Sequence, residues 1–347
     1  MSPGYLGSGS NIAQKQYVLL RTIQPKTYSR EDFLALRPSI GLDMEWGLAT
    51  ALVEQATDFQ KYMKVVRECT WVGTLLRGDP DWPDGFRAIR ERQEQVIMVG
   101  GCSTMQDSIY IDRPPKRQSI YRRVHDSVRW KSRKIPQGED GSTGSPKSEQ
   151  SRESSEPASV YRDEGEDEHL RDTDDEATVQ AVLLLLLQEV TSLVPGRTVQ
   201  WTFDHLNFKA IFAKTEFTAR TDGGLRAICG NDILTIIETK ARMRIKKSST
   251  IYMQEAAEMA LWILREESCV LDLNGRRILF SQDRHQVWLT LARYTTSYRE
   301  YLINGTIGPN SFLYMSTYGP WNILIREHML ELAIIVVSII LKTLPQQ

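Results

Sequence analysis

Cysteine and histidine are scarce in this chain. The 347 residues contain four cysteines (Cys69, Cys102, Cys229 and Cys269), far apart and without a C-x-x-C pair, and five histidines that form no cluster. This spacing argues against a structural zinc site and against a disulfide framework. It favours a reducing compartment, so we expect an intracellular protein.

The chain also lacks long apolar runs and a large net charge. The longest apolar run, Leu332 to Leu341, has ten residues and is bounded by Glu331 and Lys342, whereas a membrane span needs about twenty. We therefore expect a buried core element and no membrane partner. The N-terminus has no apolar core, so it does not resemble a secretory signal. The net charge is −1, which indicates no global attraction to a polyanion.

The charges are nevertheless segregated along the chain. Residues 113–134 carry nine basic residues against one acid, with Tyr121 and Trp130 among them. Such a run can contact phosphates, direct the protein to the nucleus, or form a solvated linker. Residues 137–176 hold fourteen acids against four bases and almost no large apolar residue, which predicts disorder. We therefore divide the chain into a mainly helical region (1–112), a charged linker (113–176) and a second domain (177–347).

The N-terminal region contains helical patterns but no recognisable chemistry. Residues 1–28 read as a poorly ordered lead-in, and S-R-E-D from Ser29 is typical of a helix start. Apolar residues at helical spacing predict one or two helices between Asp43 and Leu76, and a further helix from Phe86 to Val99. We interpret this region as a structural module.

The most informative stretch lies in the second half. Ile233 to Ala241 is an apolar, β-branched run that predicts a buried strand, on which Glu238 and Lys240 share one side. Asp222 follows a second extended segment, Thr215 to Thr221, and precedes two glycines. A turn at these glycines would bring Asp222 beside Glu238, so two carboxylates and a lysine would converge.

Two hard oxygen ligands suit Mg²⁺ or Mn²⁺, and Lys240 could orient a water or offset negative charge on a phosphate. The basic residues that follow could hold a nucleic-acid backbone (Arg242, Arg244, Lys246 and Lys247). An E-x-K triplet alone is also found as an ordinary surface pair, so the spacing leaves both interpretations open.

The pattern Asp222…Glu238-Thr239-Lys240 resembles the PD-(D/E)XK nuclease signature, without the proline of its name. Three later blocks, residues 251–263, 278–294 and 318–329, resemble the fungal PD-(D/E)XK nuclease-like proteins. The resemblance covers about residues 177–343. It implies an α/β, restriction-endonuclease-like core, with a mixed central sheet flanked by helices, and metal-dependent cleavage of nucleic acid.

The resemblance also implies roles for individual residues. Asp222 and Glu238 would bind the metal, Lys240 would be the catalytic lysine, and Gln254 matches a glutamine found in some branches. Those branches place a tyrosine four residues later, where this chain has Glu258. A helix before the first strand often contributes a glutamate, which makes Glu189, on the apolar helix Ala177–Val194, a candidate third ligand.

The remaining elements complete the predicted domain. We expect the first strand at Phe208–Phe217, a helix from Ile251 to Glu266 capped by residues 248–250, and strands at Arg277–Ser281 and Val287–Ala292. His285, in the turn between the last two strands, is interpreted as structural. The expected function is a metal-dependent phosphodiesterase acting on nucleic acid, with DNA expected before RNA. The alternative is an inactive nuclease-like module that binds nucleic acid or protein.

Overall fold

The computed structural model describes residues 12, 14–24, 26–68, 84–98, 176–212, 215–230, 232–265 and 271–345. The basic run 113–134 and the acidic run up to residue 175 lie outside these ranges. The predictions for both runs therefore concern residues outside the described part of the chain.

A mixed eight-stranded sheet forms the centre of the fold, with strands in the order β1-β10-β9-β8-β7-β6-β3 and β2 paired beside β1 on β10. Strands β7 and β8 are parallel, whereas β3, β6 and β7 and likewise β8, β9 and β10 are antiparallel neighbours. The strands of this sheet are β1 (Thr22–Ile23), β2 (Thr27–Tyr28), β3 (Val199–Thr202), β6 (Gly223–Ala227), β7 (Ile233–Lys240), β8 (Arg276–Asp283), β9 (Gln286–Arg293) and β10 (Leu313–Asn322). A separate hairpin consists of β4 (Leu206–Phe212) and β5 (Thr215–Thr221).

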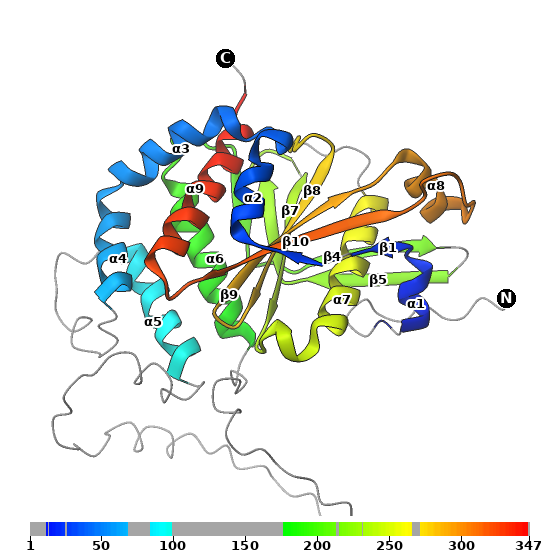
Figure 1. Cartoon of the computed structure of the whole chain (residues 1–347), viewed down its shortest axis with the longest axis horizontal. Helices are drawn as coiled ribbons and strands as arrows, with labels where there is room; N and C mark the ends of the chain where they lie inside the picture. The colour runs from blue at the N-terminus through cyan, green and yellow to red at the C-terminus, as the bar shows by residue number, and fades with distance from the viewer. Residues whose placement is uncertain are drawn as a thin grey trace, which may run out of the picture. The chain divides into compact units, whose positions relative to one another are not determined.

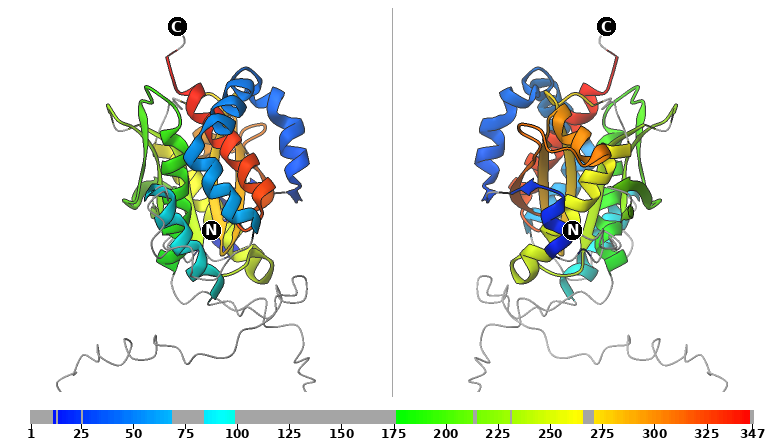
Figure 2. Two further views of the ribbon diagram at one scale, coloured as in Figure 1. Left: turned by 90° about the vertical axis from the view of Figure 1, so that its left-hand side faces the viewer. Right: turned by 90° about the vertical axis from the view of Figure 1, so that its right-hand side faces the viewer.

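Helices cover both faces of the sheet (Figure 1; Figure 2), so the architecture is α/β with a mixed sheet flanked by helices, as expected. One apolar core joins the sheet to α2 (Arg30–Leu36), α3 (Asp43–Gln55), α4 (Thr57–Glu68), α5 (Asp84–Met98), α6 (Glu176–Ser192) and α9 (Arg326–Lys342). The other core joins the opposite face to the β4–β5 hairpin, α7 (Arg244–Arg265) and α8 (Thr296–Asn304), with α1 (Gln14–Leu19) beside α7. Strand β7 is buried on both faces, which explains its unbroken apolar run.

The predicted N-terminal helices are confirmed, but the lead-in before them is not irregular. Ser29 caps α2 in a capping box with Asp32, as its sequence indicates. Within the lead-in, however, the structure contains α1, β1 and β2, and both strands pair in parallel with β10. The described residues on both sides of the charged runs therefore form one compact unit, which corrects the division into separate N-terminal and C-terminal parts.

The second half follows the prediction in most elements. Strands β8 and β9 are confirmed, and the apolar run Leu332–Leu341 lies in the buried helix α9. The expected strand Phe208–Phe217 is wrong, because these residues span the hairpin of β4 and β5, which brings Phe208 and Phe217 into the same core beside α7. None of the helices in the described ranges combines the length and apolarity that a membrane crossing requires.

Candidate metal centre

Asp222 and Glu238 lie close together because of how strands β5, β6 and β7 are arranged. Asp222 stands between β5 and β6, and its backbone N–H donates to the carbonyl of Ile237 at 2.9 Å. The next residue, Gly223, lies so close to β3 that an added Cβ would be 2.4 Å from the carbonyl oxygen of Thr202. Glycine at this point therefore lets the chain turn from the hairpin into the sheet, which places Asp222 beside the end of β7.

The Asp222 carboxylate is held by one residue of β7. Its Oδ2 accepts hydrogen bonds from the backbone N–H of Thr239 at 2.8 Å and from its hydroxyl at 2.6 Å. His205 Nδ1 lies 3.7 Å from Oδ1 and 3.0 Å from the carbonyl of Thr221. Oδ1 has no hydrogen bond within the described ranges, so it is the oxygen left to accept a further ligand.

Glu238 is the buried member of the site, with 2 % of its side chain exposed. Its Oε1 accepts hydrogen bonds from Lys240 Nζ and from Gln254 Nε2 on α7. Its Oε2 is buried and has no hydrogen-bond partner. Burial, reinforced by the charge of Asp222, raises the pKa of Glu238 to about 8.

Lys240 links Glu238 to a third acid, Glu176, at the start of α6. Its Nζ donates to Glu176 Oε1 at 3.0 Å as well as to Glu238. Burial alone would lower the pKa of Lys240, but the charges of Glu238 and Glu176 outweigh it and hold that pKa above its usual value. The lysine therefore stays an ammonium group.

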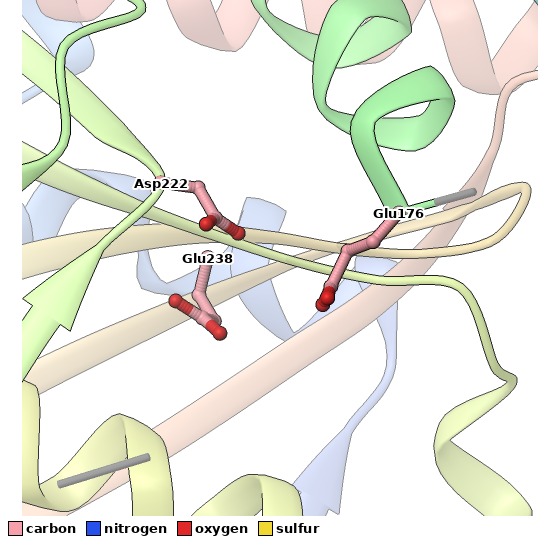
Figure 3. A group of neighbouring side chains, drawn as sticks. All are labelled: Glu176, Asp222 and Glu238. Carbon is pink, nitrogen blue, oxygen red and sulfur yellow. The ribbon is translucent and has the colours of Figure 1, made fainter. Parts of the chain in front are cut away.

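Glu176, Asp222 and Glu238 point toward one another from α6, the β5–β6 junction and β7 (Figure 3), and each offers an oxygen within 4.8 Å of the others. The N-terminus of α6 also approaches the group, because Gln180 donates a hydrogen bond to the carbonyl of Asp222. A helix N-terminus favours negative charge, which lowers the cost of gathering three carboxylates.

The helix before the first strand thus contributes a glutamate, but from Glu176 instead of Glu189. Glu189 lies thirteen residues further along α6, about 20 Å away. There it packs against Gly85 of α5, where an added Cβ would be 2.3 Å from its carboxyl carbon. Glu176 was missed because it ends the acidic run in the sequence. The signal that identifies it is its position in the first turn of α6.

Gln254 lies where the sequence predicts, over the site on α7. Besides Glu238, its side-chain amide donates to Glu258 Oε1 at 2.9 Å. Glu258 is fully buried, and burial together with the charge of Glu238 raises the pKa of Glu258 well above its usual value. Gln254 therefore bridges two buried carboxyl groups. His285 is outside this network, and burial lowers its pKa to about 4, in keeping with its structural interpretation.

The prediction that the basic residues after the site hold a nucleic-acid backbone is wrong for Arg244, whereas the side chains of Lys246 and Lys247 lie outside the described residues. Helix α7 begins at Arg244, without the predicted cap at residues 248–250, and Arg244 is buried. Its guanidinium pairs with Asp283 at 2.6 Å and with Glu255 at 2.5 Å, and donates to Ser281 Oγ at 2.8 Å. Arg242 remains exposed. Arg244 therefore fixes α7 to β8 and is removed from solvent.

The donor set fits a hard divalent cation. Three carboxylates supply oxygen ligands, and the buried Oε2 of Glu238 and the Oδ1 of Asp222 both have unused acceptor capacity. Lys240 neutralises part of this negative charge. The residues present therefore suit Mg²⁺ or Mn²⁺ better than a softer ion, which would require cysteine or histidine ligands.

The raised pKa of Glu238 predicts a pH-dependent stability in the absence of metal. The folded protein keeps this proton up to pH about 8, whereas the unfolded chain loses it near pH 4.5. The stabilisation is therefore complete below pH 4.5 and is lost as the pH rises toward 8, with a slope of at most about 1.4 kcal/mol per pH unit. Denaturant unfolding in EDTA at pH 5 to 8 measures it.

Glu238→Gln should flatten this slope relative to wild type, because the amide has no proton to release. The same substitution at Glu300, an exposed residue of α8, should leave the slope unchanged. Identical slopes for wild type and Glu238→Gln would contradict the buried position of Glu238.

Comparison with known proteins does not assign the chain to a family. No protein-family model matches the sequence, and no curated protein matches it.

Proposed function

We propose that this protein is a metal-dependent phosphodiesterase that hydrolyses nucleic acid. The observation that supports the proposal most directly is the convergence of Glu176, Asp222 and Glu238 with the ammonium group of Lys240. With a hard cation bound, the carboxylates and the protonated lysine would form a site that stabilises the negative charge developing on a phosphate in the transition state.

We further propose that α6, β3, β6, β7, α7 and β8 form a core of the PD-(D/E)XK type. The support is the place of each residue: Asp222 immediately before β6, Glu238 and Lys240 on β7, Gln254 on α7, and a glutamate on the helix before β3. Thr221 stands where the signature has proline, and Glu258 stands where some branches have tyrosine. The resemblance therefore extends to the metal ligands and the lysine more than to their surroundings.

Each residue has a distinct task in the proposed site. Thr239 holds Oδ2 of Asp222, so that Oδ1 is free for the cation. Gln254 fixes Oε1 of Glu238 and leaves Oε2 available. When bound, Mg²⁺ or Mn²⁺ would supply Lewis-acid activation of the phosphate and of the attacking water. Lys240 would orient that water or stabilise the negative charge that develops on the phosphate.

The substrate in this proposal is nucleic acid, and DNA is the first to test before RNA. The alternative is a catalytically inactive module with the same fold that binds nucleic acid or protein. Lys240 supports both functions: two of its three N–H donors are used by Glu176 and Glu238, which leaves one for a substrate. A cleavage assay decides between the two.

Metal binding can be tested separately from cleavage. Mg²⁺ should stabilise the wild-type protein by mass action, by about 2.7 kcal/mol at a hundredfold excess over Kd. Asp222→Asn should abolish the increase in Tm, because it removes a ligand charge and keeps the shape of the side chain. The control is Asp232→Asn, an exposed residue in the turn before β7. A metal-dependent Tm increase that survives in Asp222→Asn would exclude the proposed ligand set.

A further inference from the structure

A cavity with charged and aromatic walls lies on the face of the sheet that packs against α2 and α9. It has a volume of about 310 Å³, and its walls come from β2, α2 and the strands β8, β9 and β10. The lining residues are Tyr28, Leu36, Arg276, Leu291, Arg293, Tyr314, Ser316 and Tyr318.

The cavity is separate from the metal centre. Leu291 and Tyr318 belong to the core that includes α2 and α9, whereas Gln254 and Glu238 meet on the side of α7. Arg276 begins β8, and Asp283, the register partner of Lys240, ends it. Seven residues of extended chain separate these two positions by about 23 Å.

Two arginines that line this cavity lie opposite each other on neighbouring strands. Arg276 on β8 and Arg293 on β9 are register partners in the antiparallel pair. Like charges directly opposite each other destabilise a sheet. Among the described residues, no carboxylate lies within ion-pair distance of either guanidinium. Within the described part of the chain, the pair is therefore a concentration of positive charge without a counter-charge.

The surroundings of the two arginines hold them in place without neutralising them. Nη1 of Arg276 donates to the carbonyl oxygen of Ser39 at 3.0 Å, which ties this side chain to the 3-10 helix Arg37–Ile40 after α2. Arg293 lies over the ring of Tyr314, 5.5 Å from its centroid. Guanidinium groups bind phosphate with paired N–H donors, so an oriented arginine pair is suited to a phosphate group.

Aromatic side chains form the adjacent wall. Tyr28 stacks on Tyr318 with ring centroids 5.2 Å apart, and Tyr314 is the register partner of Arg293 on β10. Aromatic rings and arginine planes provide stacking surfaces for nucleobases. Ser316 adds a hydroxyl group between the tyrosines. Stacking surfaces next to a phosphate site are what a nucleotide requires.

We propose that this cavity binds a nucleoside phosphate, with its phosphate on Arg276 and Arg293 and its base against the tyrosines. The volume is at the lower end of the range for ligand sites, which suits one nucleotide and excludes a duplex. The nucleotide can be free or can be the phosphorylated end of a single strand. This inference goes beyond the proposed hydrolysis, because it uses none of the residues of the metal centre.

Calorimetric titration of the full chain in EDTA tests the ligand class without engaging the metal centre. AMP should bind at least about tenfold more tightly than adenosine or ribose 5-phosphate, because each of these lacks one of the two recognised parts. Phenyl phosphate is included as a mimic of phosphotyrosine. Binding of phenyl phosphate as tight as that of AMP would overturn the nucleotide assignment, and so would equal affinities for AMP and ribose 5-phosphate.

A short single strand distinguishes the two sources of the ligand. If the source is a strand end, a 5′-phosphorylated tetranucleotide should bind more tightly than AMP, and its unphosphorylated form should not. If the source is a free nucleotide, AMP should bind more tightly than either strand. Both results support binding of a nucleoside phosphate in the cavity. Equal binding of the two tetranucleotides, together with no binding of AMP, would contradict it.

Substitutions at the rim assign the binding to this cavity. Arg293 is exposed, so Arg293→Gln should fold normally and weaken AMP binding about tenfold or more, with little change for adenosine. Tyr314→Ala should weaken AMP binding more than ribose 5-phosphate binding. Arg197→Gln, at an exposed arginine in the loop after α6, is the matched control and should leave AMP binding unchanged. Equal affinity of wild type and Arg293→Gln for AMP would refute the proposal.

Discussion

Replacing Lys240 with alanine should reduce cleavage of nucleic acid about a hundredfold or more and leave Mg²⁺ binding intact. The ammonium group donates to Glu176 and Glu238 at the end of β7, so it is positioned to stabilise charge on a phosphate. Lysine is not a metal ligand here, because its pKa is held above the usual value and the nitrogen stays protonated. The measurement is single-turnover cleavage of labelled DNA and RNA at saturating Mg²⁺, beside the metal-dependent increase in Tm.

The matched control is Lys61→Ala. Lys61 is an exposed lysine that approaches Asp58 at 3.9 Å, and it lies on α4, which carries none of Glu176, Asp222 and Glu238. Its cleavage rate should equal that of wild type. Cleavage at the wild-type rate by Lys240→Ala would remove the lysine from the mechanism. If wild type binds metal and cleaves neither DNA nor RNA, the protein acts as a binding module.

The convergence of Asp222, Glu238 and Lys240 could be predicted because its signal is local. The apolar run from Ile233 predicts a strand, and the alternation of that strand places Glu238 and Lys240 on one side. The turn expected at the two glycines after Asp222 is wrong, because they begin strand β6, but the pairing of β6 with β7 still places Asp222 beside the end of β7. Each step needs only neighbours in sequence or a single turn, so pattern and resemblance point to the same residues.

The parts that could not be predicted depend on contacts between distant residues. Strands β1 and β2 have two residues each, too few for an alternating pattern, and exist because β10 pairs with them nearly 300 positions later. Glu176 looks like the end of an acidic segment until α6 is seen to begin there. In the sequence Arg244 looks like part of a basic run. Its acidic partners, Glu255 on α7 and Asp283 at the end of β8, are 11 and 39 positions away.

Arg244 supplies the largest expected effect on stability. Arg244→Met should destabilise the fold by about 3–5 kcal/mol, because it leaves two buried carboxylates without their cation. The pair to Glu255 and the pair to Asp283 are both removed from solvent, so water cannot replace the lost guanidinium. Denaturant unfolding at pH 7 measures the loss. Arg220→Met, at an exposed position of β5, is the control and should cost little.

The pH dependence of this variant separates loss of charge from loss of packing. Burial already raises the pKa of Asp283 to about 6 although Arg244 opposes the shift. Without Arg244 the folded protein should hold that proton to higher pH, whereas the unfolded chain still releases it near 3.8. The variant should therefore be destabilised less at pH 5 than at pH 8.

Adding Glu255→Gln and Asp283→Asn to Arg244→Met should recover much of the stability, since neutral groups do not require the cation. If the triple variant is no more stable than Arg244→Met, the loss comes from packing of the arginine side chain against Tyr252 and Trp288, not from its charge.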